Sequence, residues 1–112
     1  MTKSEVAVTT LSRKEVSIFY QIVREELKRE NITWENFVSR VYTPSVRRAR
    51  HRVVWRLSQE LKLTKKTMAD LIEIDESTVR GILKTLTETN GVLPKQMFLQ
   101  RTRRKPITEN RV

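Results

Sequence analysis

The stretch "TKKTMADLIEIDESTVRGILK", residues 64–84, decides which fold we expect. It contains two short segments with apolar residues at helical spacing, and acidic residues around Asp75 separate them. Thr64 is placed to cap a helix over residues 65–73, and a second helix is expected over roughly 77–89. The pattern therefore predicts two short helices joined by a tight turn.

This pair of helices has the features of a helix-turn-helix. Such a motif needs a small residue within its first helix, and Ala69 takes this place. The turn usually contains a glycine, whereas Glu73 stands there. An αα-hairpin without a ligand is the alternative interpretation. The apolar residues expected to hold the two helices together are Met68, Ile72, Ile74, Val79 and Ile82.

Three further helices are expected before this pair. Ser12 and Glu15 form a capping box that begins the first of them. A shorter helix is predicted over 34–41. Pro44 stands in the first turn of a third, whose apolar stripe extends to Leu61. The predicted fold class is all-α, a small helical bundle of about five helices containing a helix-turn-helix.

The bundle is expected to occupy residues 11–91, between two extensions. Residues 1–10 are small and polar, and we interpret them as a flexible N-terminal arm. Gly91 is a plausible end for the last helix, because glycine readily adopts the left-handed conformation found there. Residues 92–112 are interpreted as a C-terminal extension and basic tail. Residues 92–100 could form a short helix on the core, a wing of two strands, or a dimer contact.

The charge of the chain is strongly positive and unevenly distributed. The 112 residues carry a net charge of +10. Residues 43–91 hold ten basic and six acidic side chains, and residues 92–112 hold six and one. Such a concentration of positive charge is typical of proteins that bind a polyanion. Charge alone does not distinguish nucleic acid from an acidic membrane surface, or from a basic domain that binds neither.

The composition argues against several classes of protein. No apolar run approaches the ~18–20 residues needed to span a bilayer, and the first residues do not resemble a secretory signal. The chain has no cysteine and one histidine, so a disulfide framework and thiolate metal sites are excluded. We expect a cytoplasmic protein that does not bind a membrane, has no metal or cofactor, and is not an enzyme.

Arginines crowd the helix predicted after Pro44. Arg48, Arg52 and Arg56 are spaced i, i+4, i+8 and would form a ridge along one side of that helix. We expect few carboxylates near this ridge, which favours a surface that faces phosphates. The residues predicted to contact phosphates are Arg47, Arg48, Arg52, Arg56, Lys65 and Lys66.

The first residues of the predicted recognition helix would face outward. In a helix-turn-helix, side chains at this place meet base edges and phosphates in the major groove. Gly81 lies among them, although a glycine costs a helix ~1 kcal/mol relative to alanine. Close approach of the backbone to DNA or to a neighbouring helix would explain it.

With these elements in place, the chain resembles a known family over roughly residues 15–90. It is similar to the C-terminal DNA-binding domain of the bacterial replication initiator DnaA, which is similar in fold to the Trp repressor. The resemblance rests on Ile32, Ser39, "SVRRAR" at 45–50, "LSQEL" at 57–61, which resembles the family's "LAKEL", and "DESTV" at 75–79, which resembles its "DHTTV".

The resemblance implies roles for individual residues. Arg50 would enter the minor groove, while Asp75, Ser77 and Thr78 would belong to the major-groove reader. Glu76 stands where the family has histidine; it would either accept a hydrogen bond from a cytosine amino group or act as a favourable charge at the helix N-terminus. The residues predicted to read bases are Arg50, Glu76, Ser77, Thr78, Arg80 and Lys84.

These observations predict a sequence-specific protein that binds double-stranded DNA and regulates transcription or replication. Its small format favours a phage or mobile element as its source. The other hypothesis is a protein-interaction module or inhibitor that targets a replication or transcription protein. A homodimer is left open. No glycine-rich nucleotide-binding loop is present, since the only glycines are Gly81 and Gly91.

Overall fold

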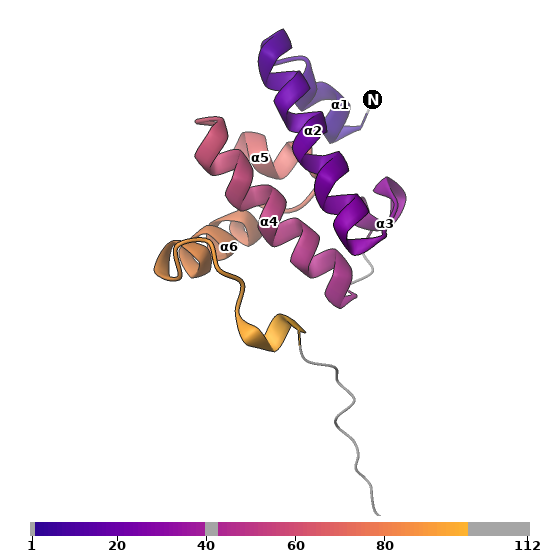
Figure 1. Ribbon diagram of the computed structural model, residues 1–112. Coiled ribbons are helices and arrows are strands. Elements are labelled where there is room, and N and C mark those ends of the chain that lie inside the picture. Colours follow the sequence, from indigo (N-terminus) through magenta and orange to yellow (C-terminus); the bar gives the residue numbers. More distant parts are fainter. Residues whose placement is uncertain (1, 40–42, 99–112) are drawn as a thin grey trace, which may run out of the picture.

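The computed structural model describes residues 2–39 and 43–98. In this part every regular element is a helix and no β-strand is present, so the predicted all-α class is confirmed. Helix α4 lies between α2 and α6, with α5 packed on α6 (Figure 1). The elements are α1 (Lys3–Val8), α2 (Arg13–Glu30), α3 (Trp34–Val38), α4 (Pro44–Glu60), α5 (Lys65–Leu71), α6 (Glu76–Glu88) and the 3₁₀ helix η1 (Lys95–Phe98).

Hydroxyl side chains fix where most of the helices begin. At the N-cap of each of the first five helices, a serine or threonine oxygen accepts a hydrogen bond from the backbone N–H three residues on, which satisfies one of the free donors of the first turn. The Ser12–Glu15 capping box is present as predicted. The capping residues are Thr2, Ser12, Thr33, Thr43 and Thr64.

The first residues form a helix where a flexible arm was expected. Thr2 and Glu5 make a second capping box, in which the Thr2 backbone N–H donates to the Glu5 carboxylate at 2.8 Å. Ala7 is buried, and α1 packs against α5. The prediction was wrong because a helix of six residues is too short to show a clear apolar period, and helices this short depend on tertiary packing.

Other helix boundaries differ from the prediction by a few residues. Helix α3 ends at Val38, because Ser39 is in an extended conformation, and residues 40 and 41 of the predicted helix lie outside the described residues. Helix α5 ends at Leu71, two residues early, because Glu73 adopts a left-handed φ of +58° that leaves the helical region. Helix α6 begins one residue early, at Glu76.

The C-terminal extension continues the core as far as η1. Leu93 and Met97 are buried against the bundle. Of the three structures considered for residues 92–100, the short helix on the core is therefore observed up to Phe98. The last two residues of that range lie outside the described part.

A single apolar core joins α2, α4, α5 and α6. Its largest fully buried side chains include Phe19, Phe37 and Leu57, and burial of each such side chain contributes about 1.5–3 kcal/mol. The predicted contacts of α5 and α6 are also confirmed, since Met68, Ile72, Val79 and Ile82 are buried and Ile74 packs at the edge of the core.

Candidate nucleic-acid interface

The turn between α5 and α6 reverses the chain within residues 72–75. Glu73 stands where a helix-turn-helix usually has glycine, and its φ of +58° is a conformation that glycine adopts most easily. The Ile74 backbone N–H donates to the Ala69 carbonyl at 2.9 Å and closes the turn. Ala69 is buried, so the small residue allows the close packing expected of it. We call α5, this turn and α6 the α5–α6 unit.

Helix α6 has one buried face and one exposed face. Val79, Ile82 and Leu86 point into the core, as the helical period requires. The opposite face is exposed to solvent, together with the first turn. All α6 residues predicted to read bases are thus at the surface, namely Glu76, Ser77, Thr78, Arg80 and Lys84.

Among the described residues, the ion pairs found for cations of the α5–α6 unit are weak and exposed. Arg80 pairs with Glu76 at 3.3 Å, and its side chain remains 62% exposed. Lys66 pairs with Asp70 at 3.5 Å and is 74% exposed. Exposed pairs at i, i+4 stabilise a helix by only ~0.3–0.5 kcal/mol. For Lys65 and Lys84, no ion pair is found with the described residues. These charges are therefore available to an external anion.

Gly81 lies on the exposed face of α6 with space around it. A Cβ atom built at this position would meet no heavy atom within 4 Å, apart from its own helix backbone. The neighbouring-helix explanation for this glycine is therefore wrong. No intramolecular contact among the described residues requires a glycine at this position.

Arg50 is buried, contrary to the predicted role in the minor groove. Its side chain is 5% exposed, and its guanidinium donates to the carbonyl of Phe37 at 3.0 Å and that of Ser39 at 2.6 Å. These bonds fasten α4 to the end of α3, whose last carbonyls lack helical partners. An arginine held in this way is not available to a DNA groove, and this correction removes it from the predicted base-reading residues.

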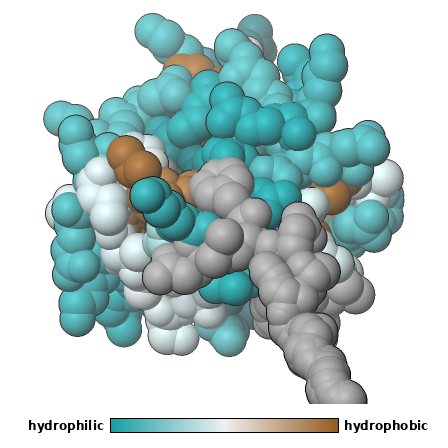
Figure 2. Space-filling model, turned by 60° about the horizontal axis from the view of Figure 1, so that its bottom comes forward, coloured by the Kyte–Doolittle hydropathy of each residue, from teal (hydrophilic) through white to brown (hydrophobic). Residues whose placement is uncertain are grey.

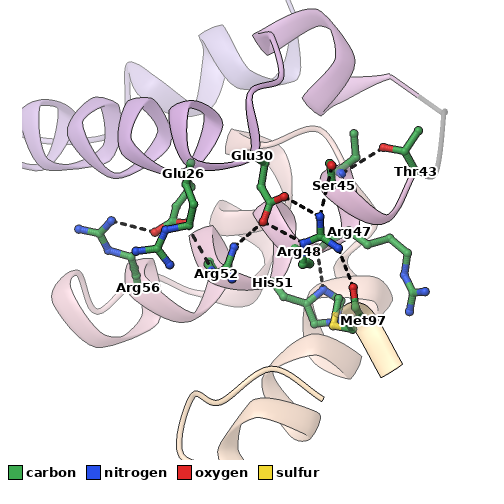
Figure 3. Close-up of polar contacts among 12 residues, drawn as sticks. Glu26, Glu30, Thr43, Ser45, Arg47, Arg48, His51, Arg52, Arg56 and Met97 are labelled. Carbon is green, nitrogen blue, oxygen red and sulfur yellow. Dashed lines mark hydrogen bonds and ion pairs between the residues drawn. The ribbon is translucent and has the colours of Figure 1, made fainter. Parts of the chain in front are cut away.

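The predicted arginine ridge on α4 faces glutamates of α2 (Figure 3). Arg48 binds Glu30 through two hydrogen bonds of 2.8 and 2.9 Å, and Arg52 binds the same carboxylate at 2.6 Å. The hydrogen bond from Arg48 holds the pKa of Glu30 below its usual value. Arg48 also donates to the carbonyl of Met97 at 2.7 Å and so anchors η1.

Arg56 completes this network. It contacts Glu25 at 2.8 Å, Glu26 at 3.1 Å and Glu60 at 3.5 Å. Glu26 is only 2% exposed and lies between the two helices, whereas Glu25 and Glu60 are exposed. We call Arg48, Arg52 and Arg56, with the buried carboxylates of Glu26 and Glu30, the α2–α4 network.

The expectation of few carboxylates near the ridge was therefore wrong. Apart from Glu60 of α4, the acidic partners come from α2, far from α4 in the sequence, and the packing of α2 on α4 brings them together. The spacing of Glu26 and Glu30, i and i+4 on the same helix face, is the signal that could have indicated them. Because their charge is compensated inside the protein, we no longer assign Arg48, Arg52 and Arg56 to phosphates.

Arg47 is the one arginine of the predicted phosphate set on α4 whose side chain is exposed. Its carbonyl accepts a hydrogen bond from His51 Nδ1 at 2.9 Å. Because a carbonyl only accepts, this bond fixes the proton on Nδ1. Burial lowers the pKa of the histidine, and the charge of Arg47 lowers it further.

The structure brings three of the predicted residues to one place. Lys65, Arg80 and Lys84 line a hollow of about 610 Å³ between α4, α5 and α6. Sequence reasoning missed the apolar residues of this hollow, Trp55 and Leu83. Both residues contact the core, and in the helical pattern of the sequence they cannot be told from ordinary core residues.

The rest of the surface is mainly hydrophilic. Figure 2 shows hydrophobic residues only in small, separate patches on the end of the molecule that it views. Among residues 2–39, 43–95 and 97, whose side chains the structure describes, the exposed large hydrophobic side chains are those of Val6, Tyr20 and Val92. Within the same ranges, no group of three histidine or carboxylate side chains could hold a metal ion. No helix described there is both long and apolar enough to cross a bilayer.

Comparison with known proteins does not assign the chain to a family. No family model matches it, and neither does any curated protein or solved structure. The resemblance to the DNA-binding domain of DnaA stays a prediction.

Proposed function

We propose that this protein binds double-stranded DNA in a sequence-specific way and regulates transcription or replication. In this proposal the α5–α6 unit acts as a helix-turn-helix with α6 in the major groove. The observation that carries the proposal is the exposed face of α6, where Ser77, Arg80 and Lys84 surround the open position of Gly81.

The dimensions and chemistry of α6 suit this role. A helix of 13 residues is about 20 Å long, and a major groove about 12 Å wide accepts a helix. Arg80 can donate two hydrogen bonds to a guanine, and Ser77 and Thr78 can bond to bases or phosphates. Gly81 lets the helix backbone approach the bases.

The acidic first turn of α6 limits how the helix can enter the groove. Asp75 is the N-cap residue but makes no side-chain capping bond, and Glu76 is exposed beside it. Negative charge is favourable at a helix N-terminus but repels phosphates. We therefore place this turn toward base edges, where Glu76 either accepts from a cytosine amino group or orients Arg80. Lys65, Lys66 and Lys84 would contact the backbone.

The experiment is the selection of bound sites from a random double-stranded pool at ~150 mM salt, which suppresses non-specific binding. We expect an enriched motif for the native chain and a relaxed base preference at one position for Arg80→Ala. Lys14→Ala, which removes an exposed charge near the start of α2, is the matched control and should leave the motif unchanged.

Two results would count against the proposal. One is the absence of any enriched motif from a folded protein. The other is a loss of affinity for Arg80→Ala that is equal for all sequences, which would leave only non-specific attraction. Partner binding that survives high salt, without retardation of DNA, would support the protein-interaction hypothesis instead.

A further inference from the structure

The hollow between α4, α5 and α6 combines an apolar lining with a charged rim. Trp55 comes from α4 and Leu83 from α6, and both are partly buried. Lys65, the first residue of α5, and Arg80 and Lys84 of α6 stand around them. Glu88 lies at the last turn of α6 and is the one carboxylate of this lining. The hollow thus offers an apolar surface and three cations on adjacent elements.

Gly91 packs closely against the pyrrole edge of the Trp55 indole. Gly91 has a φ of +88° and lies so close to the indole that a Cβ atom there would clash with it. The backbone N–H of Gly91 donates to the Leu86 carbonyl at 2.8 Å, which fixes this turn after α6. The aromatic face is therefore preorganised, and a ligand would not need to order it.

The rim favours an anion with repeated charges. Lys65 and Lys84 belong to different helices that line the hollow, and the ion pair found for Arg80 among the described residues is its exposed contact with Glu76. A single small anion would use one of these charges and leave the apolar surface uncovered. One strand of a nucleic acid fits better, because each sugar presents an apolar C–H face between two charged phosphates.

The position of the hollow agrees with such a strand. It lies directly beside the exposed face of α6, since Arg80 and Lys84 belong to both. When a recognition helix occupies a major groove, a sugar–phosphate strand borders the helix on each side. A strand on the side of α5 would pass over this hollow.

We propose that the hollow seats the sugar–phosphate backbone of one strand of bound duplex DNA. A deoxyribose packs on Trp55 and Leu83, and the flanking phosphates bind Lys65 and Lys84. This inference rests on the proposed function, since it assumes that α6 faces the duplex. Beyond the proposed function, this inference adds an aromatic contact and two lysine–phosphate contacts, which would fix the orientation of α6 in the groove.

Trp55 itself provides the readout. In the full-length Trp34→Phe variant, Trp55 is the only tryptophan, and phenylalanine keeps an aromatic ring beside Phe37. A labelled duplex of mixed sequence is added at ~50 mM salt, where phosphate contacts are strong. Polarisation of the label reports binding, and acrylamide, which is uncharged, reports the accessibility of Trp55. We expect the acrylamide quenching constant to fall as the duplex saturates the protein.

Salt dependence tests the lysines. Lys65→Ala and Lys84→Ala are each expected to reduce the slope of log K against log salt by about one, while Lys14→Ala leaves the slope unchanged. Both substituted side chains are exposed, so these variants should fold.

The outcomes separate the two proposals. Suppose that the duplex binds, that the accessibility of Trp55 is the same with and without it, and that Lys65→Ala has the salt slope of the native chain. The proposed seat in the hollow is then wrong, and the proposed function stands. If the duplex does not bind, both fail. If poly-glutamate protects Trp55 and the duplex does not, the hollow belongs to an acidic protein partner and the seat is again overturned.

Discussion

The α2–α4 network and the α5–α6 unit contain similar numbers of cations in opposite environments. Arg48 of the network is 17% exposed and bound twice to one carboxylate, whereas Arg80 of the unit is 62% exposed with one longer contact. In the sequence both appear as basic residues on helices at i, i+4 spacing. The difference shows that net charge does not tell how much charge faces a partner, because the fold decides which cations meet a glutamate.

The two environments also differ in what each cation does. In the network, removal of one partner leaves a charge of opposite sign poorly solvated, which costs several kcal/mol. In the unit, an exposed pair contributes almost nothing to stability. We therefore expect substitutions in the network to change stability and substitutions in the unit to change binding.

The largest effect is expected for Glu30→Ala. This variant removes the carboxylate shared by Arg48 and Arg52, so we expect the free energy of unfolding to fall by about 3 kcal/mol. Urea denaturation measures it. Glu25→Ala is the matched control on the same helix, because Glu25 is 48% exposed, and it should cost less than about 1 kcal/mol. If both variants lose the same small amount of stability, the ion pairs of Glu30 contribute no more than an exposed surface pair does.

Arg50→Lys is expected to have the next largest effect. Lysine keeps the charge but cannot reproduce the guanidinium fork that binds the carbonyls of Phe37 and Ser39, so we expect a loss of about 2 kcal/mol. Denaturation and DNA affinity should be measured together. If the variant keeps native stability but loses DNA affinity, Arg50 has the minor-groove role implied by the resemblance to DnaA. Burial of an arginine would then not exclude a role in binding.

Features that depend on contacts between residues close in the sequence were predicted better than features that depend on contacts between distant helices. Capping boxes and apolar periods are local, so α2 to α6 and the core of the α5–α6 unit were predicted within one or two residues at most boundaries, whereas α1 was missed. The partners of Arg48, Arg52 and Arg56 were not, because they lie on another helix and require the packing of α2 on α4 to be known. The burial of Arg50 was not predicted for the same reason. Its acceptors are backbone carbonyls of another segment, which every residue has and which the sequence therefore does not mark.

Gly81→Ala tests whether the exposed face of α6 in the α5–α6 unit contributes to binding rather than to stability. The added Cβ meets no other group, so we expect the helix to gain about 1 kcal/mol in the free energy of unfolding. The same methyl group would stand between α6 and the bases, so DNA affinity should fall while stability rises. Gly91→Ala is the control, and it should destabilise the protein because of its positive φ and its contact with Trp55. Unchanged affinity for Gly81→Ala would show that this face does not approach a ligand.

The smallest effect concerns His51, which reports the local charge beside the network. Since it is the only histidine, its NMR titration is unambiguous, and burial should place its pKa below the usual 6.5. A folded-state pKa below the unfolded value means that the native state favours neutral imidazole. This contribution to stability is present above pH 6.5 and is lost as the pH falls through the folded-state pKa.

The neighbour responsible can be identified with two variants. Arg47→Ala should raise the pKa of His51, because it removes the one nearby positive charge that lowers this pKa while the carbonyl that His51 binds remains. Lys14→Ala lowers the net charge by the same amount and should leave the pKa unchanged. If both variants raise the pKa equally, the histidine senses the net charge of the whole chain, and the glutamates of α2 do not compensate the arginines of α4 as the ion pairs indicate.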